Sequence, residues 1–330
     1  MRNQEDNGLM NTPPPFGADD QSSSMRARLR PMGFGDILDE TFALYRQNFV
    51  LFISTVAIVQ VLVLVVTIAL GLAFIASSLS SIVTTLQNAA NAQDFSQVGG
   101  VIAGAVVFAL VLLAVNAIAA TLQGAALALI ISNRFLGKTI TVGAAYKAAF
   151  NRLGALLTAQ VWIFVRFLIA VVVNVVILGL IGAVLHSAAI LLILIIASVC
   201  FYIYFAVTWI VTTQAIILEG ARGFGATGRS RALIGGFWWK TFGLALLLYV
   251  VNLLLSRIGG TIGGTGSTGL IVSAIVSFVV GVLFEPIQMC VYTLLFYDLK
   301  IRKEAFDLEA LAQQTSLAES SYAPAPSAYS

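Results

Sequence analysis

Residues 50–75 read VLFISTVAIVQVLVLVVTIALGLAFI, a stretch without a single charged side chain. About 20 apolar residues in a helix suffice to cross the hydrocarbon core of a bilayer. The whole chain shares this character, because 59% of its 330 residues are hydrophobic. Only 10% are charged, against about 25% in soluble domains. The composition therefore excludes an ordinary soluble domain and predicts a membrane protein.

Six apolar stretches of this kind follow one another along the chain. They are Val50–Ile75, Val101–Ser132, Leu153–Leu185, Ala188–Leu218, Trp238–Ser256 and Leu270–Leu299. Helix tilt or continuation into the headgroup region can absorb any length beyond about 20 residues. The sequence therefore predicts an all-α polytopic fold with six transmembrane helices.

Both ends of the chain have a different, polar composition. Residues 1–30 contain Pro, Ser and Gln clusters, and the last residues alternate Ala and Pro, which is typical of disordered segments. The predicted organisation has four parts. These are a disordered cytoplasmic tail over 1–30, a six-span membrane domain over 31–299, a cytoplasmic juxtamembrane helix over 300–311 and a disordered tail over 312–330.

The basic residues predict the orientation. Of the 18 lysines and arginines, all but Arg166 and Arg257 lie before the first span, after the last one, or in the connections between spans two and three and spans four and five. Cytoplasmic segments of membrane proteins carry an excess of Lys and Arg. We therefore expect both termini to be cytoplasmic and the protein to lie in the cell (inner) membrane.

An amphipathic segment precedes each odd-numbered span. The three segments open with Phe34-Gly35, Val142-Gly143 and Phe224-Gly225. Apolar residues at the acyl boundary and basic residues at the headgroups are typical of an interfacial helix. The pattern favours three cytoplasmic interfacial helices, each followed by a helical hairpin, in a pseudo-threefold repeat. The alternative is that any segment beside a membrane looks amphipathic by chance.

Residues suited to catalysis are scarce. The single histidine, His186, lies in the short turn between spans three and four, which leaves no set of ligands for a histidine-based metal centre. The sequence also contains no Gly-rich phosphate loop that ends in Lys-Ser or Lys-Thr. Gly33–Asp36 and Tyr297-Asp298 match two short motifs of intramembrane aspartyl proteases. In those enzymes, however, two carboxylates face each other inside the bilayer, whereas Gly33–Asp36 lies outside any span. We expect no enzyme, no cofactor or metal, and no nucleic-acid partner.

Two charged residues lie deep inside predicted spans. Arg166 is 13 residues from Leu153, and Glu285 is 13 residues from Asp298, each counted from the cytoplasmic end of its span. At about 1.5 Å per residue, both would lie about 20 Å deep. Since a single charge at such depth costs about 2.5–3.5 kcal/mol, we predict an ion pair between Arg166 and Glu285, with Gln288 in support. The pair would serve either as a lock for the bundle or as a proton or anion site.

Three segments resemble a known family. They are residues 33–46 (GFGDILDETFALYR), the stretch from Glu219 to Trp238, and residues 294–309 (LLFYDLKIRKEAFDLE). Together they are similar to the membrane domain associated with bacterial glycerophosphodiester phosphodiesterases. The resemblance spans about residues 31–311. The sequence shows no counterpart of the catalytic barrel that the fused members of the family carry. The resemblance implies a standalone bacterial membrane domain from a family whose activity is undefined.

The sequence therefore favours a non-enzymatic multi-pass inner-membrane protein, either lipid-associated or a membrane partner module. Its expected partners are membrane lipids, including anionic headgroups, and an unidentified membrane protein, because basic residues near a bilayer attract acidic lipids. The alternative is a small transporter or channel, since internal repeats are common in transporters. Its path would be lined by the polar residues within the spans. These include Gln60, Asn116, Gln123, Gln160, Asn174, Gln214, Asn252 and Gln288.

Overall fold

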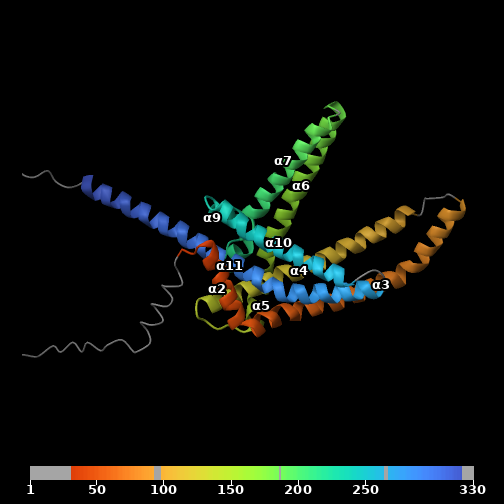
Figure 1. Ribbon diagram of the computed structural model, residues 1–330, viewed down its shortest axis with the longest axis horizontal. Coiled ribbons are helices and arrows are strands. Elements are labelled where there is room, and N and C mark those ends of the chain that lie inside the picture. Colours follow the sequence, from red (N-terminus) through yellow and green to blue (C-terminus); the bar gives the residue numbers. More distant parts are fainter. Residues whose placement is uncertain (1–30, 93–97, 186, 264–266, 322–330) are drawn as a thin grey trace, which may run out of the picture.

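The structure is a computed structural model that describes residues 31–92, 98–185, 187–263 and 267–321, and in these ranges it contains helices and no strand. The predicted tail over 1–30, the turn residue His186 and the last nine residues lie outside the described part. The helices are α2 (Phe34–Gln47), α3 (Phe49–Ala92), α4 (Val98–Phe135), α5 (Val142–Asn151), α6 (Leu153–Leu185), α7 (Ala188–Thr208), α8 (Thr212–Glu219), α9 (Phe224–Ile234), α10 (Trp238–Gly263) and α11 (Ser267–Ser321) (Figure 1). The predicted all-α class is confirmed.

Six helical segments within the described ranges are long and apolar enough to cross a membrane. They are Phe49–Thr85, Gly99–Phe135, Leu153–Val184, Ala189–Glu219, Trp238–Arg257 and Ile271–Glu304. The fourth segment consists of α7 and α8, which a turn at residues 209–211 separates. These segments match the six predicted spans, so the chain is a multi-pass membrane protein.

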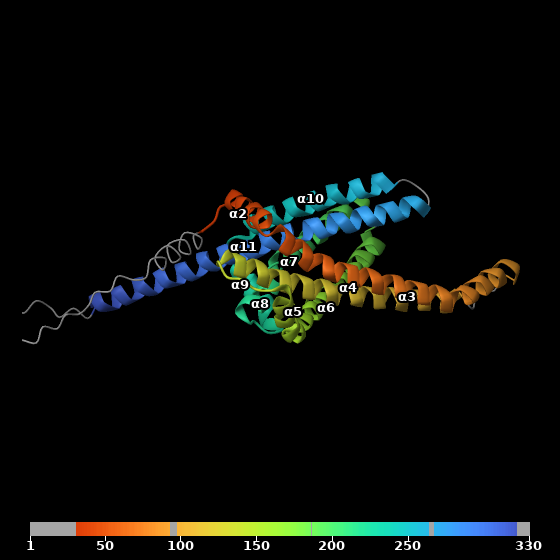
Figure 2. The same ribbon diagram turned by 90° about the horizontal axis from the view of Figure 1, so that it is seen from below.

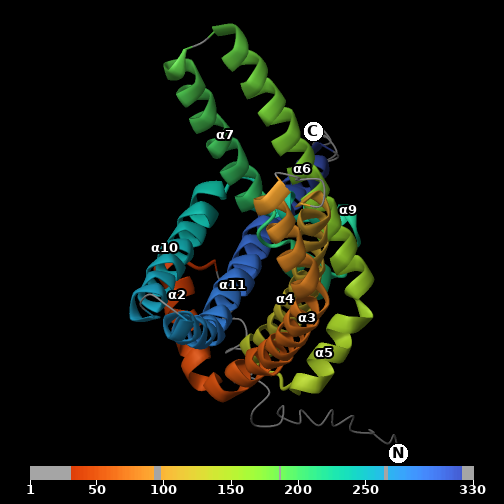
Figure 3. The ribbon, with the colours of Figure 1, turned by 90° about the vertical axis from the view of Figure 1, so that its right-hand side faces the viewer.

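The long helices form three hairpins, α3–α4, α6–α7 and α10–α11. The α6–α7 hairpin diverges from the other two (Figure 1), whereas α10 and α11 lie side by side (Figure 2). Figure 3 shows α6 and α7 extending away from α10 and α11. The short helices α2, α5, α8 and α9 gather at the end where the hairpins converge (Figure 2). We call these four helices, with the adjoining ends of the long helices, the hub.

Each hairpin follows one short helix, in the order α2–α3–α4, α5–α6–α7 and α9–α10–α11, as the predicted repeat requires. The short helices begin at recognisable caps. The Asp36 carboxylate accepts a hydrogen bond from the Gly33 backbone N–H at 2.8 Å, and the Thr141 hydroxyl accepts one from the Ala144 N–H at 3.3 Å. Such bonds satisfy N–H groups that a helix start leaves without an intrahelical partner.

The short helices differ from helices that lie alone on a membrane surface. The buried face of α2, formed by Ile37, Thr41 and Leu44, packs against α11, and both apolar residues join a core cluster with Leu294 and Leu295. Similarly, α5 buries Ala145 and Ala149 in a second core cluster shared with α3 and α4. The protein itself therefore covers part of each apolar stripe, whereas Phe42 of α2 and Phe150 of α5 stay exposed.

Both core clusters lie in the hub, whereas the distant halves of the hairpins expose apolar side chains. Val172 and Val173 of α6 and Leu192 of α7 are examples of exposed residues. Surfaces of this kind would be unfavourable in water, since burial of apolar area is what stabilises a soluble fold. They suit a surrounding of lipid acyl chains.

The last helix is longer than the sequence analysis predicts. Residues 300–311 are helical, but α11 continues to Ser321, into the segment assigned to the second tail. Residues 301–321 contain neither Gly nor Pro and are rich in Ala, Leu, Glu and Gln. Because these residues favour helix and nothing in the segment interrupts it, the helix runs on.

Candidate functional site

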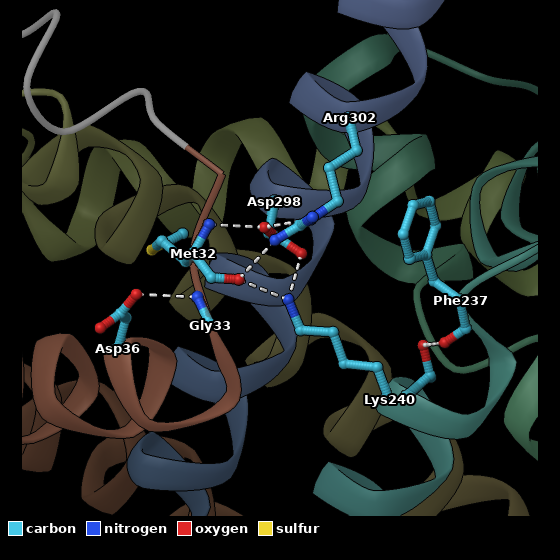
Figure 4. Close-up of polar contacts among 8 residues, drawn as sticks. Met32, Gly33, Asp36, Phe237, Lys240, Asp298 and Arg302 are labelled. Carbon is cyan, nitrogen blue, oxygen red and sulfur yellow. Dashed lines mark hydrogen bonds and ion pairs between the residues drawn. The ribbon is translucent and has the colours of Figure 1, made fainter.

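The carboxylate of Asp298 joins the start of the described chain to the last two spans (Figure 4). The Asp298 side chain is 0% exposed. Its Oδ1 accepts hydrogen bonds from the Met32 backbone N–H at 2.7 Å and from Arg302 Nε at 2.9 Å. Its Oδ2 accepts one from Lys240 Nζ at 2.5 Å. Charge-assisted bonds of this kind are about twice as strong as neutral ones.

The backbone carbonyl of Met32 completes the cluster. It accepts from Lys240 Nζ at 2.6 Å and from Arg302 Nη2 at 2.9 Å, so both cations contact the same two acceptor groups. Arg302 also lies 5.5 Å from the centre of the Phe237 ring. Since both carboxylate oxygens are bonded, this arrangement acts as a clamp. It ties residue 32 to α10 and α11.

A second ionic cluster joins α8, α9 and α11. Arg229 donates from Nε and Nη2 to the two oxygens of Glu219, at 2.7 and 2.9 Å. Lys300 Nζ lies 3.1 Å from Glu219, and Arg229 also contacts Glu304 at 3.2 Å. The hydrogen bonds to Glu219, and then the charges of Glu219 and Glu304, raise the pKa of Arg229. The two-pronged contact fixes the direction in which α9 leaves α8.

The structure does not bring Arg166 and Glu285 together. Within the described residues, no ion pair of 4.0 Å or less joins them. The guanidinium of Arg166 lies 4.4 Å from the Trp162 ring centre and 5.8 Å from that of Trp209. Gln288 donates to the Tyr292 hydroxyl at 3.2 Å. Its predicted supporting contact with the Arg166–Glu285 pair is likewise absent from the described residues.

The reason lies in where α7, the first part of the fourth segment, ends. Helix α7 has 21 residues, about 32 Å at 1.5 Å per residue, which is enough to cross the hydrocarbon core. Trp209 follows it directly, and Arg166 lies against Trp209. Arg166 is therefore level with the end of α7 instead of its middle, and its cation lies against aromatic rings. The first part of α6 packs in the hub against α8 and α9.

Glu285 is met by residues from three other helices. Gln60 of α3 donates from Nε2 to Glu285 Oε2 at 3.4 Å. Gln123 of α4 is 1% exposed and adjoins the same carboxylate, but its Nε2 has no hydrogen-bond partner among the described residues. The Tyr146 hydroxyl of α5 donates to the Thr55 carbonyl at 2.7 Å. Burial, and then the charge of Glu285, raise the pKa of Tyr146.

This Glu285 cluster was only partly predictable. The sequence identified Gln60, Gln123 and Glu285 as polar residues within spans, but it did not group them. A carboxylate with amide neighbours can hold a proton or a small cation, and equally it can fasten α3, α4 and α11 to one another by hydrogen bonds.

Many cations of the hub have no carboxylate partner. Among the described residues, those that form no ion pair are Arg46, Arg134, Lys138, Lys147, Arg152, Arg222, Arg231 and Lys303, which we call the basic collar. Most of these side chains are exposed. Asp36, Asp39 and Glu40 of α2 are the described carboxylates of the hub that likewise form no ion pair, so these eight cations leave an excess of positive charge at the end where the hairpins converge.

The four tryptophans of the chain border this end. Trp162 packs on Phe224 at the start of α9, with ring centres 4.3 Å apart, and Trp209 follows α7. Trp238 and Trp239 open α10, where Trp238 stacks on Phe242. Trp and Tyr are enriched at membrane–water interfaces because their rings are apolar with a polar edge. Their position is typical of a headgroup-level belt beside the hub.

Comparison of the chain with family models, with curated proteins and with solved structures finds no match. The fold defines the class, an all-helical multi-pass membrane protein with six apolar helices. The resemblance to the membrane domain of the phosphodiesterases stays a prediction.

Proposed function

We propose that the protein is a non-enzymatic multi-pass protein of the bacterial inner membrane whose cytoplasmic hub engages anionic lipid headgroups. The observation that carries the proposal is the basic collar, a group of cations without carboxylate partners beside the tryptophan belt. Each Lys or Arg near an anionic bilayer surface contributes about 1 kcal/mol to the attraction. The collar also agrees with cytoplasmic termini, since positive charge accumulates on that side.

The experiment measures which lipids surround the protein. The chain is reconstituted in vesicles of phosphatidylcholine with a minority of phosphatidylglycerol and excised with its lipid shell by a membrane-solubilising polymer. We expect phosphatidylglycerol to be enriched in the shell over the bulk vesicle, and the enrichment to fall as salt screens the charges. A shell with the bulk composition would contradict the proposal.

A matched pair of variants separates the collar from total charge. Replacing Arg46, Lys138 and Lys147 with Gln should reduce the enrichment, because three cations leave the hub. Arg257→Gln removes a cation near the opposite end of α10 and should leave the enrichment unchanged. Equal effects of collar and Arg257 substitutions, corrected for the number of charges, would count against a role of the hub.

The second candidate is a transporter or channel, which one observation favours. Glu285 lies in a cluster with amides from two other spans, and polar groups inside a membrane often mark a path for ions or protons. A flux assay with a pH-sensitive dye in proteoliposomes tests it. Proton flux that Glu285→Gln abolishes would support this function, and flux no greater than in empty vesicles would argue against it.

A further inference from the structure

A cleft of about 700 Å³ opens in the hub between the α5–α6 junction and the loop that joins α8 to α9. Asn151, Arg152 and Thr158 line one side, and Gly220, Arg222 and Gly223 line the other. None of the nine lining residues is acidic. Its volume falls within the range of about 300–1,000 Å³ found for small-ligand pockets. We infer that this cleft binds the phosphate group of one anionic lipid, an inference that rests on the proposed function.

Arg152 is held in place at the cleft. Its Nη1 donates to the Ile216 carbonyl in the last turn of α8 at 2.7 Å. A guanidinium has five N–H donors, so this bond leaves others for a ligand. Gly220 has a φ of +78°, and a Cβ at this position would lie 3.0 Å from Arg152 Nη1. The glycine thus permits both the left-handed turn and the close approach of the guanidinium.

Arg222 supplies the second cation from the opposite side. It is exposed, and within the described residues it forms no ion pair. The neighbouring Gly223 has a φ of +47°, which lets the chain turn sharply into α9. Two guanidinium groups across a cleft without carboxylates suit a phosphate, because the planar fork of Arg matches phosphate oxygens in pairs.

The position of the cleft favours a lipid over free phosphate. Thr158 lies one helical turn before Trp162 on α6, and Trp162 packs on Phe224 at the start of α9. Phe224 is 63% exposed. The cleft therefore lies beside the tryptophan belt, at the level that headgroups occupy, with apolar side chains next to it for the upper part of the acyl chains.

Binding is measured by titrating short-chain phosphatidylglycerol into the full-length chain in a neutral detergent, with native mass spectrometry counting bound lipids. We expect one saturable site. Arg222→Gln should weaken it about fivefold, and Arg152→Gln with Arg222→Gln about 25-fold, if each arginine contributes as a cation at an anionic surface does. Arg257→Gln removes one exposed arginine far from the cleft and should change the affinity less than about twofold, because distant charges are screened.

A competition with inorganic phosphate identifies the ligand, and a comparison of single variants separates loss of binding from misfolding. Millimolar inorganic phosphate should not displace the lipid; displacement at that level would show a site for free phosphate and overturn the inference. Within the described structure the Arg222 side chain forms no hydrogen bond or ion pair, and its backbone carbonyl, which accepts from the Gly225 N–H, is unchanged by substitution. Arg222→Gln therefore carries the test if Arg152→Gln unfolds α8. Equal affinities of Arg222→Gln and Arg257→Gln would also overturn it. If the lipid shell is still enriched in phosphatidylglycerol, the proposed function stands without this site; if that enrichment is absent too, both fail.

Discussion

The carboxylate of Asp298 accepts a hydrogen bond from the backbone N–H of Met32 at 2.7 Å, across 266 positions of the chain. The contact joins the segment before the first span to the end of the last one. Lys240 and Arg302 bind both residues, so α10 takes part as well. One buried carboxylate, together with the Met32 carbonyl, therefore ties the three elements to one another.

Asp298→Ala should destabilise the protein by about 3–5 kcal/mol, because it leaves two cations near a site with no carboxylate to balance them. The measurement is the free energy of unfolding in mixed micelles titrated with a denaturing detergent. Asp298→Asn is the matched control, since it keeps one oxygen to accept the Met32 N–H and should cost less. A loss below about 0.5 kcal/mol for the alanine variant would mean that the clamp does not stabilise the fold.

Glu219 and Glu304 both contact Arg229, but they should differ in their contribution. The Glu219 side chain is 15% exposed and accepts two hydrogen bonds from Arg229. Glu304 is 50% exposed and accepts one from Arg229, beside a looser contact of 3.7 Å with Lys300. We expect Glu219→Gln to cost about 1.5–3 kcal/mol. Glu304→Gln should cost about 0–1 kcal/mol, as exposed pairs do. Parallel unfolding experiments compare them, and equal losses would contradict the assignment.

The fold was largely predictable because its main determinant is local. A run of apolar residues longer than a bilayer is thick predicts a spanning helix without knowledge of its neighbours, and all six runs became long helices. The three short helices were predicted from their amphipathic pattern. Their packing was not, because the same apolar stripe of α2 suits a lipid surface and the flank of α11 equally well.

The sites were less predictable because they depend on long-range packing. Arg302 lies four residues after Asp298, and this spacing could have indicated their contact. Nothing local connects Asp298 to Met32 or to Lys240. The prediction of an ion pair between Arg166 and Glu285 rested on the assumption that a membrane span begins where its apolar run begins. The first turns of α6 belong to the hub, so counting from Leu153 overestimated the depth of Arg166.

Ionisation of the Tyr146 hydroxyl should lower the free energy of unfolding at high pH. Burial and the nearby charge of Glu285 raise the pKa of its hydroxyl above the usual value of 10.0. For an acid whose pKa is raised by folding, the stabilisation is complete below the unfolded pKa and is lost as the pH rises above it. The free energy of unfolding should therefore decline above about pH 10, by up to about 1.4 kcal/mol per pH unit from this group.

Tyr146→Phe is the comparison for that measurement. It removes the hydrogen bond to the Thr55 carbonyl and should cost about 1 kcal/mol at neutral pH. Its free energy of unfolding should then decline less between pH 10 and 12 than that of the original chain. Parallel curves for the two proteins over this interval would show that the Tyr146 hydroxyl ionises as an ordinary tyrosine does.

A double-mutant cycle between Arg166 and Glu285 should show additive effects. In the structure Arg166 contacts tryptophans, and Glu285 accepts from Gln60, so the two residues share no partner. Unfolding free energies of Arg166→Leu, Glu285→Leu and the double variant should combine within about 0.5 kcal/mol. The cycle between Gln60→Leu and Glu285→Leu is the positive control, and it should show coupling of about 0.6 kcal/mol or more, typical of hydrogen bonds between spans. Coupling above about 1 kcal/mol between Arg166 and Glu285 would mean that the two charges do pair in the membrane, with α6 closer to α11 than the diverging hairpins place it.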